Sequence, residues 1–204
     1  QSLRRLVTPA SGLGVCHNDH ASTHIAPIRS KMKILYLSVG AGGSDKVLLN
    51  LLDGFKDSSI EVFVVVHKRS SLITEISARG ISPLVLRYKP DVWPRSETLT
   101  DKIKLPWRVC KQLLINHFAV RRLADYARAN RIDLIHTNTG VFHIGYQAAR
   151  RCRIPHVWHL HEYQDRDMRL TPFPSRRDFV RKLQDPASYK IAITDDVFNH
   201  FQLK

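Results

Sequence analysis

Cysteine and long apolar runs are scarce in this sequence of 204 residues. Its three cysteines, Cys16, Cys110 and Cys152, lie far apart, and none belongs to a CxxC pair. Disulfide scaffolds and zinc ribbons need more cysteines at closer spacing, so both classes are excluded and a reducing compartment is favoured. No apolar run approaches the roughly 18 residues of a membrane-spanning helix. Residues 1–31 also lack the apolar core of a signal peptide.

Acidic residues are scarce as well, which leaves a strongly basic chain. Lys and Arg number 32 against 18 Asp and Glu, and the net charge is +14. Such a surface attracts polyanions, namely nucleic acid, anionic lipid headgroups or phosphorylated substrates, but total charge does not choose among them. The excess is greatest from Asp101 to Arg131, where eight basic residues accompany only two acids. Further basic clusters lie at 150–153 and 176–182.

The character of the chain changes at Met32. Residues 1–31 are rich in Ser, His, Pro and Gly without periodicity, so we interpret them as an extension that is disordered or not native. From Met32 onward, apolar segments of strand length alternate with segments of helical spacing. The run at 60–67, rich in β-branched residues, is typical of a strand buried on both faces. The sequence therefore predicts an α/β fold over residues 32–204, a Rossmann-like parallel sheet with helices on both faces.

The alternation predicts six strands and the helices between them. The strands are expected at 33–39, 60–67, 83–87, 133–136, 155–160 and 189–194. The helices are expected at 45–55, 70–79, 107–130, 140–151 and 175–184, with another beginning at 195. The proline-containing segments 88–106 and 171–174 are predicted to be loops. Ligands of parallel α/β sheets bind at the carboxyl ends of the strands, so the residues that end each strand are the candidates for a site.

The first strand leads into a glycine-rich loop at 40–44 (GAGGS), which contains Gly42, Gly43 and Ser44. Glycines let a ligand approach the backbone closely, and the N-terminus of the following helix suits an anion. The loop is not the GxGxxG of dinucleotide-binding folds, because Asp45 takes the last glycine position, and it is not a Walker A loop. A tight turn between strand and helix is the alternative interpretation.

Polar residues end the fourth strand. His136 is followed by Thr137, Asn138, Thr139 and Gly140 at an edge that is expected to face a cleft. Thr and Asn are also good caps for the next helix, and that interpretation stays open.

The fifth strand ends in His159, His161 and Glu162, with both histidines on the same side. A metal pair is one interpretation, but no cluster of Cys or carboxylates at ligand spacing supports it. A histidine that forms hydrogen bonds or handles a proton is favoured for His161, and a structural histidine is the alternative. Thr194, at the end of the sixth strand, is expected to cap a helix.

Together these segments resemble the N-terminal half of a retaining glycosyltransferase of family 4, which has the GT-B fold. The matching stretches are 32–35 (MKIL) leading to Gly42-Gly43, 46–52 (KVLLNLL), 132–137 (IDLIHT), 154–158 (IPHVW), His161-Glu162 and 191–194 (IAIT). The resemblance covers residues 32–200. It implies transfer of a hexosyl group from a nucleotide sugar to a glycan or lipid-linked acceptor, without a cofactor or metal.

The resemblance also implies roles for residues of this chain. His161 and Glu162 are implied to be catalytic. Acceptor or donor binding is implied for Gly42, Gly43, Ser44, His136, Asn138, Thr139 and Thr194. The expected setting is the synthesis of cell-envelope polysaccharide in the cytoplasm, at the inner face of the plasma membrane.

The sequence departs from the family pattern in two places. Ser44-Asp45 stands where the family commonly has Glu after the double glycine. Moreover, neither a second Rossmann-like domain nor the paired-glutamate motif of the donor site follows in this sequence. The resemblance thus implies an acceptor-binding half that is inactive alone, with the donor domain supplied by a longer chain or by a partner subunit.

The basic helix predicted at 107–130 suggests docking on an anionic bilayer. The residues expected to make that contact are Trp107, Lys111, Arg121 and Arg122. The alternative is an ordinary helix on the sheet with its charges in solvent. Its apolar positions are Val109, Leu113, Leu114, Phe118, Leu123 and Tyr126.

Two other functions stay open. A non-enzymatic module that binds nucleic acid or an anionic membrane fits the charge, although RRM, KH and helix-turn-helix signatures are missing and nucleic acid is therefore disfavoured. A dinucleotide-binding domain needs an acidic residue at the end of the second strand, where His67-Lys68-Arg69 stands.

Overall fold

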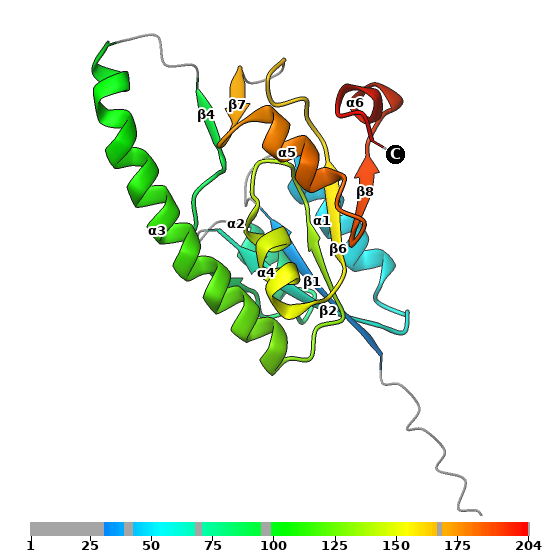
Figure 1. Cartoon of the computed structure of the whole chain (residues 1–204). Helices are drawn as coiled ribbons and strands as arrows, with labels where there is room; N and C mark the ends of the chain where they lie inside the picture. Colours follow the sequence, from blue (N-terminus) through cyan, green and yellow to red (C-terminus); the bar gives the residue numbers. More distant parts are fainter. Residues whose placement is uncertain (1–30, 39–42, 68–70, 95–98, 167–168, 204) are drawn as a thin grey trace, which may run out of the picture. The chain divides into compact units, whose positions relative to one another are not determined.

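The computed structural model describes residues 31–38, 43–67, 71–94, 99–166 and 169–203 (Figure 1). The predicted extension at 1–31 lies outside the described residues, apart from Lys31. Gly42 of the glycine-rich loop also lies outside them, whereas Gly43 and Ser44 are described.

A six-stranded parallel sheet forms the centre of the domain, with strand order β3-β2-β1-β5-β6-β8. Its strands are β1 (Met32–Ser38), β2 (Ile60–Val66), β3 (Leu84–Val85), β5 (Leu134–Thr137), β6 (His156–Leu160) and β8 (Ser188–Ala192). The chain builds outward from β1 to β3 and then returns to add β5 on the other side of β1. Ligands of such sheets bind beside this change of direction, at the carboxyl ends of β1 and β5.

Helices cover both faces of the sheet, as the sequence predicts. They are α1 (Gly43–Gly54), α2 (Ser71–Ser77), α3 (Leu99–Ala129), α4 (Ile144–Cys152), α5 (Arg176–Leu183) and α6 (Asp195–His200). Alternation along β1 sends Tyr36 into the core beneath α1 and α2, and Leu35 into the core beneath α3 and α4. Beyond β6, Trp158 packs with Phe179 of α5 and Phe201 in a third cluster.

The predicted loop at 88–106 is wrong at both of its ends. Residues Val92–Pro94 form strand β4, which pairs antiparallel with β7 (Leu170–Pro172), and β7 overlaps the other predicted loop at 171–174. Helix α3 begins at Leu99 and contains Pro106. Proline is tolerated at strand edges, where its missing N–H is not needed. Pro94 and Pro106 therefore lie within a strand and a helix, and they do not mark a loop as the sequence had suggested.

The buried face of α3 also differs from the prediction. Leu123 is fully buried, but Leu113, Leu114 and Phe118 are 53 %, 56 % and 61 % exposed. Small and polar residues take their place against the domain: Gln112, Asn116, Ala119, Val120, Ala124 and Ala127. Within the described residues, no helix is long and apolar enough to cross a membrane.

Candidate functional site

Asn138 joins the ends of three strands at the carboxyl edge of the sheet. Its Nδ2 donates to the backbone carbonyl of Ser44, 2.7 Å away, at the start of α1. Its Oδ1 lies 2.9 Å from Nε2 of His161, just beyond β6. An amide oxygen only accepts hydrogen bonds, so Nε2 of His161 carries the proton in this arrangement. Three residues that the sequence nominated separately are therefore in direct contact.

A second contact at this edge joins Thr139 to Glu162. The Thr139 hydroxyl donates to the Glu162 carboxylate over 2.6 Å and accepts the backbone N–H of Val141 over 3.2 Å. Thr139 is buried and Glu162 is half-buried. The hydroxyl thus holds the carboxylate beside His161, and a carboxylate is a group that accepts hydrogen bonds from hydroxyl groups.

His136 lies deeper than the other candidates. It is buried, and its ring stacks on Tyr36 with centroids 4.5 Å apart. A row of rings continues from His136 to His159 at 5.4 Å and from His159 to His161 at 4.2 Å. Burial lowers the pKa of His136 to about 3 and that of His159 to about 4, and it also lowers the pKa of His161. At neutral pH the row is uncharged and supports His161 from below.

The start of α1 and the end of β8 hold the remaining candidates. A Cβ added to Gly43 would meet open space, so packing does not require a glycine there. Asp45, which the sequence did not nominate, accepts a hydrogen bond from the Ser38 hydroxyl over 2.7 Å and ties α1 to β1. The Thr194 hydroxyl accepts the N–H of Val197 over 3.2 Å, which confirms the predicted helix cap. The binding roles of Gly43 and Thr194 stay predictions.

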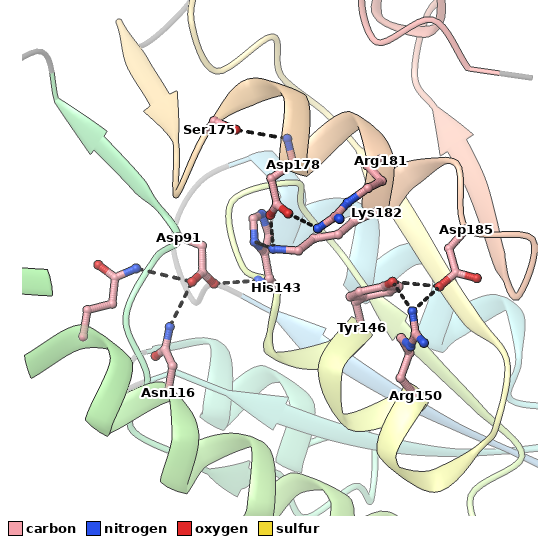
Figure 2. Close-up of polar contacts among 11 residues, drawn as sticks. Asp91, Asn116, His143, Tyr146, Arg150, Ser175, Asp178, Arg181, Lys182 and Asp185 are labelled. Atoms are coloured by element: carbon pink, nitrogen blue, oxygen red, sulfur yellow. Dashed lines mark hydrogen bonds and ion pairs between the residues drawn. The ribbon is translucent and has the colours of Figure 1, made fainter. Parts of the chain in front are cut away.

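Asp91 is a buried structural residue that the sequence analysis did not single out (Figure 2). Its buried carboxylate accepts hydrogen bonds from the side chains of Asn116 at 3.2 Å and Gln112 at 3.3 Å, and from the backbone N–H of His143 at 2.8 Å. Burial raises the pKa of Asp91 against the opposing effect of these donors and of Lys182. Two amides four residues apart on the buried face of a helix were the signal, because such a face is normally apolar.

The backbone of Asp91 strengthens the same junction. Its N–H donates to the carbonyl of Val141 over 2.7 Å, and its carbonyl accepts the N–H of Phe173 over 2.8 Å. The segment that carries Asn138 and Thr139 is therefore fastened both to α3 and to the β4–β7 pair.

Figure 2 shows a further polar group between α4 and α5. Lys182 pairs with Asp178 at 2.6 Å, and its ammonium lies 3.2 Å from Nδ1 of His143. Burial lowers the pKa of His143 to about 3, helped by the charge of Lys182. The Tyr146 hydroxyl donates to Asp185 over 2.7 Å. Helix α5 is thus held to α4, beneath the candidate site, by polar side chains.

The sequence profile of Glycosyltransferase Family 4 matches residues 41–202. The chain belongs to glycosyltransferase family 4. This match confirms the resemblance that the motifs indicated. No protein of curated function matches the sequence significantly.

Solved GT-B glycosyltransferases share the fold of this family 4 domain. The Anabaena Alr3699/HepE protein, solved with UDP-glucose, is 22% identical with a TM-score of 0.57, and the match covers 84% of this chain and 40% of that protein. A glycosyltransferase from Rickettsia africae ESF-5 is 12% identical with a TM-score of 0.59, and the match covers 86% of this chain and 41% of that protein. MurG of Acinetobacter baumannii is 14% identical with a TM-score of 0.50, and the match covers 79% of this chain and 45% of that protein. Such identities show the fold alone, and this chain spans less than half of each relative.

One large hollow among the described residues does not coincide with the candidate site of the family 4 domain. It measures about 840 Å³ and is lined by Lys56, Ile60 and Arg79, at the amino edge of the sheet. Ligands of parallel α/β sheets bind at the carboxyl edge, so side-chain chemistry locates this site better than volume does. Across the described ranges, no three His, Cys, Asp or Glu side chains gather where they could hold a metal ion.

Proposed function

We propose that this family 4 domain supplies the acceptor-binding half of a glycosyltransferase. The enzyme would transfer a hexosyl group from a nucleotide sugar to a glycan or lipid-linked acceptor, with retention of configuration. The observation that carries the proposal is the contact of Asn138 with both His161 and the Ser44 carbonyl. This contact brings together His161 and two residues that directly follow matching stretches of the family, Ser44 after Gly42-Gly43 and Asn138 after 132–137. The UDP-glucose bound to the related Anabaena protein supports a nucleotide sugar as donor.

His161 and Glu162 have different roles in this proposal, one toward the transferred sugar and the other toward the acceptor. His161 is uncharged at neutral pH and held by Asn138, so it offers a ring nitrogen to a hydroxyl of the transferred sugar. The Glu162 carboxylate, held by Thr139, accepts a hydrogen bond from the acceptor hydroxyl and orients it. As the acceptor oxygen bonds to the anomeric carbon, the bond from that carbon to the nucleoside diphosphate breaks, and the departing diphosphate keeps the bonding electrons and takes up the acceptor proton. Binding roles for Gly42, Gly43, Ser44, His136 and Thr194 belong to the same proposal.

The start of α1 suits the phosphates of the donor. The unpaired N–H groups of a helix N-terminus bind anions, and Gly43 leaves room for close approach. We propose that a second domain, in the same polypeptide or in a partner subunit, binds the nucleotide and that this chain alone is inactive. No metal or organic cofactor takes part. The proposed setting is cell-envelope polysaccharide synthesis at the cytoplasmic face of the plasma membrane.

The test combines this chain with its donor-binding half and measures transfer from UDP-glucose and other nucleotide sugars. We expect His161→Ala to lower kcat by a factor of about 100 or more and Asn138→Ala by about 10, because each removes a positioned polar group. Asn199→Ala, on the exposed surface of α6, is the matched control and should retain full activity. Undiminished transfer by His161→Ala would contradict the proposal.

A further inference from the structure

Helix α3 carries a row of exposed apolar side chains. Its members are Leu99, Ile103, Trp107, Leu114 and Phe118, and they are 74 %, 70 %, 72 %, 56 % and 61 % exposed. Successive members are four or seven residues apart, so they lie on one face of the helix. The buried side of α3, with Gln112, Asn116 and Leu123, points toward the domain. We call these five residues the apolar row.

A partner for the apolar row is expected on physical grounds. Single exposed apolar side chains are normal on a protein surface, but monomers rarely expose large contiguous apolar patches without a function. Three of the five members lie in the first nine residues of α3, from Leu99 to Trp107. Leu99 and Ile103 lie where the sequence had predicted a loop, whereas Trp107 was already expected to contact a membrane, so the full length of the row becomes visible only in the structure.

Basic side chains border the apolar row along one side. Lys104, Arg108, Lys111 and Arg122 are all exposed and follow one another at helical spacing; we call them the basic row. Arg121 is exposed as well, one residue before the last member. The sequence from Lys102 to Ala124 contains no acidic residue. An apolar face bordered by cations is the pattern of a helix that lies in the plane of an anionic membrane surface.

A pocket of about 370 Å³ adjoins the basic row. Its lining includes Lys89 together with Arg108 and Lys111, and the ring of Trp93. Three cations and an aromatic ring beside an exposed apolar face suit a phosphate headgroup at the boundary between water and lipid.

Two other occupants fit less well. A second copy of the chain packed α3 against α3 would bring two cationic rows together without acids to neutralise them. Nucleic acid would use the cations and the aromatic rings, but Leu99, Ile103 and Leu114 gain nothing from phosphates or stacked bases. A lipid surface uses both rows.

We propose that α3 docks this domain on an anionic bilayer. The apolar row enters the interfacial region, and the basic row binds lipid headgroups. Through Gln112 and Asn116 the docked helix holds Asp91, and Asp91 accepts the backbone N–H of His143 (Figure 2). His143 ends the segment that carries Asn138 and Thr139. The candidate site is thus mechanically linked to the docking helix. Docking does not depend on sugar transfer, so either proposal stands if the other fails.

The test is co-sedimentation of the full chain with vesicles of phosphatidylcholine, with and without phosphatidylglycerol. We expect binding that requires the anionic lipid and weakens with salt. The triple variant Lys104→Gln, Lys111→Gln, Arg122→Gln should bind roughly 100-fold more weakly at low salt. The double variant Ile103→Ser, Leu114→Ser should bind at least about tenfold more weakly. The Trp107 fluorescence should shift to shorter wavelength on binding.

Matched variants on other surfaces serve as controls. One control removes three exposed cations elsewhere, with the triple variant Lys56→Gln, Arg151→Gln, Arg177→Gln. The other removes two exposed apolar side chains near β8, with the double variant Tyr189→Ser, Ile193→Ser. Both should bind vesicles nearly as the parent does. Losses that match those of the α3 variants would overturn the proposal. So would equal binding to neutral vesicles, or a dimer in sedimentation velocity that the Ile103→Ser, Leu114→Ser variant abolishes. The chain could instead bind an RNA duplex in preference to vesicles, with no loss in the Ile103→Ser, Leu114→Ser variant. That result would overturn the proposal and indicate that α3 binds nucleic acid.

Discussion

Helices α3 and α4 pack against each other on the same face of the sheet and use their apolar residues in opposite ways. In α4, Ile144, Tyr146 and Ala148 are buried, and Gly145 lies so close to Thr137 that an added Cβ would overlap its hydroxyl. In α3, the largest apolar side chains of the first half are exposed instead. Both helices are amphipathic by pattern. The difference teaches that periodicity finds a helix but does not say which of its apolar residues reach the core.

Acidification should have the largest effect, because the buried histidines concerned lie in strands β5 and β6 and at the start of α4, whereas the exposed side chains of α3 do not titrate in this way. The folded-state pKa of His136 and His143 is about 3 and that of His159 about 4, and each lies below the ordinary histidine pKa of 6.5. Below pH 6.5 the unfolded chain therefore binds protons that the folded chain refuses, and stability falls by up to about 1.4 kcal/mol per pH unit for each such group.

We expect the urea midpoint to fall steeply between pH 6.5 and pH 4 and to change little, on account of these groups, above pH 6.5. The variant His136→Gln should have a shallower dependence than the parent, since it removes one of the groups that titrate differently in the two states. An unchanged midpoint across this range would contradict the assignment of uncharged, buried histidines.

Truncation at two leucines of α3 sharpens the comparison within one helix. Leu123 is fully buried and Leu114 is 56 % exposed. Leu123→Ala should lower the free energy of unfolding by about 2–5 kcal/mol, because it leaves a cavity in the core. Leu114→Ala should change it by less than about 0.5 kcal/mol. Urea denaturation of both variants measures the difference, and equal losses would show that the exposed face of α3 packs on something in the free chain.

The polar junction between α3 and α4 gives the next largest effect. In Asp91→Asn, one carboxylate oxygen becomes an amide donor facing the donors of Gln112, Asn116 or His143. We expect a loss of about 2 kcal/mol, the penalty of an unsatisfied buried polar group. Asp195→Asn, on the exposed start of α6, should cost much less. Chemical denaturation at pH 7 compares the two, and an equal cost would contradict the role given to Asp91.

The smallest effect concerns Thr194. Removal of its hydroxyl in Thr194→Ala should cost about 1 kcal/mol, because the N–H of Val197 loses its capping partner. Thr194→Ser keeps the cap and should restore most of that stability. If Thr194→Ser also restores sugar transfer in the two-domain enzyme, the hydroxyl suffices for both roles. A transfer defect that persists in the Ser variant would point to a contact of the methyl group.

Much of the candidate site could be predicted from the sequence, because one topological rule places its residues together. Parallel strands end at the same edge, so residues that end β1, β5 and β6 were expected to meet. Asn138, His161 and Ser44 do meet there. The rule does not say, however, how deeply each of these residues is buried. His136 ends a strand as the others do, yet it is buried beneath them in contact with Tyr36.

The sequence by itself determined the fold class, the family and most strand positions, since runs of Val and Ile and the residues after them are local signals. Tertiary structure alone decided the pairing of β4 with β7, the early start of α3 and the exposure of its apolar row. It also decided the burial of Asp91 among three donors. These features depend on groups far apart in the chain, and a pattern read within one segment contains no information about the partner that segment will find.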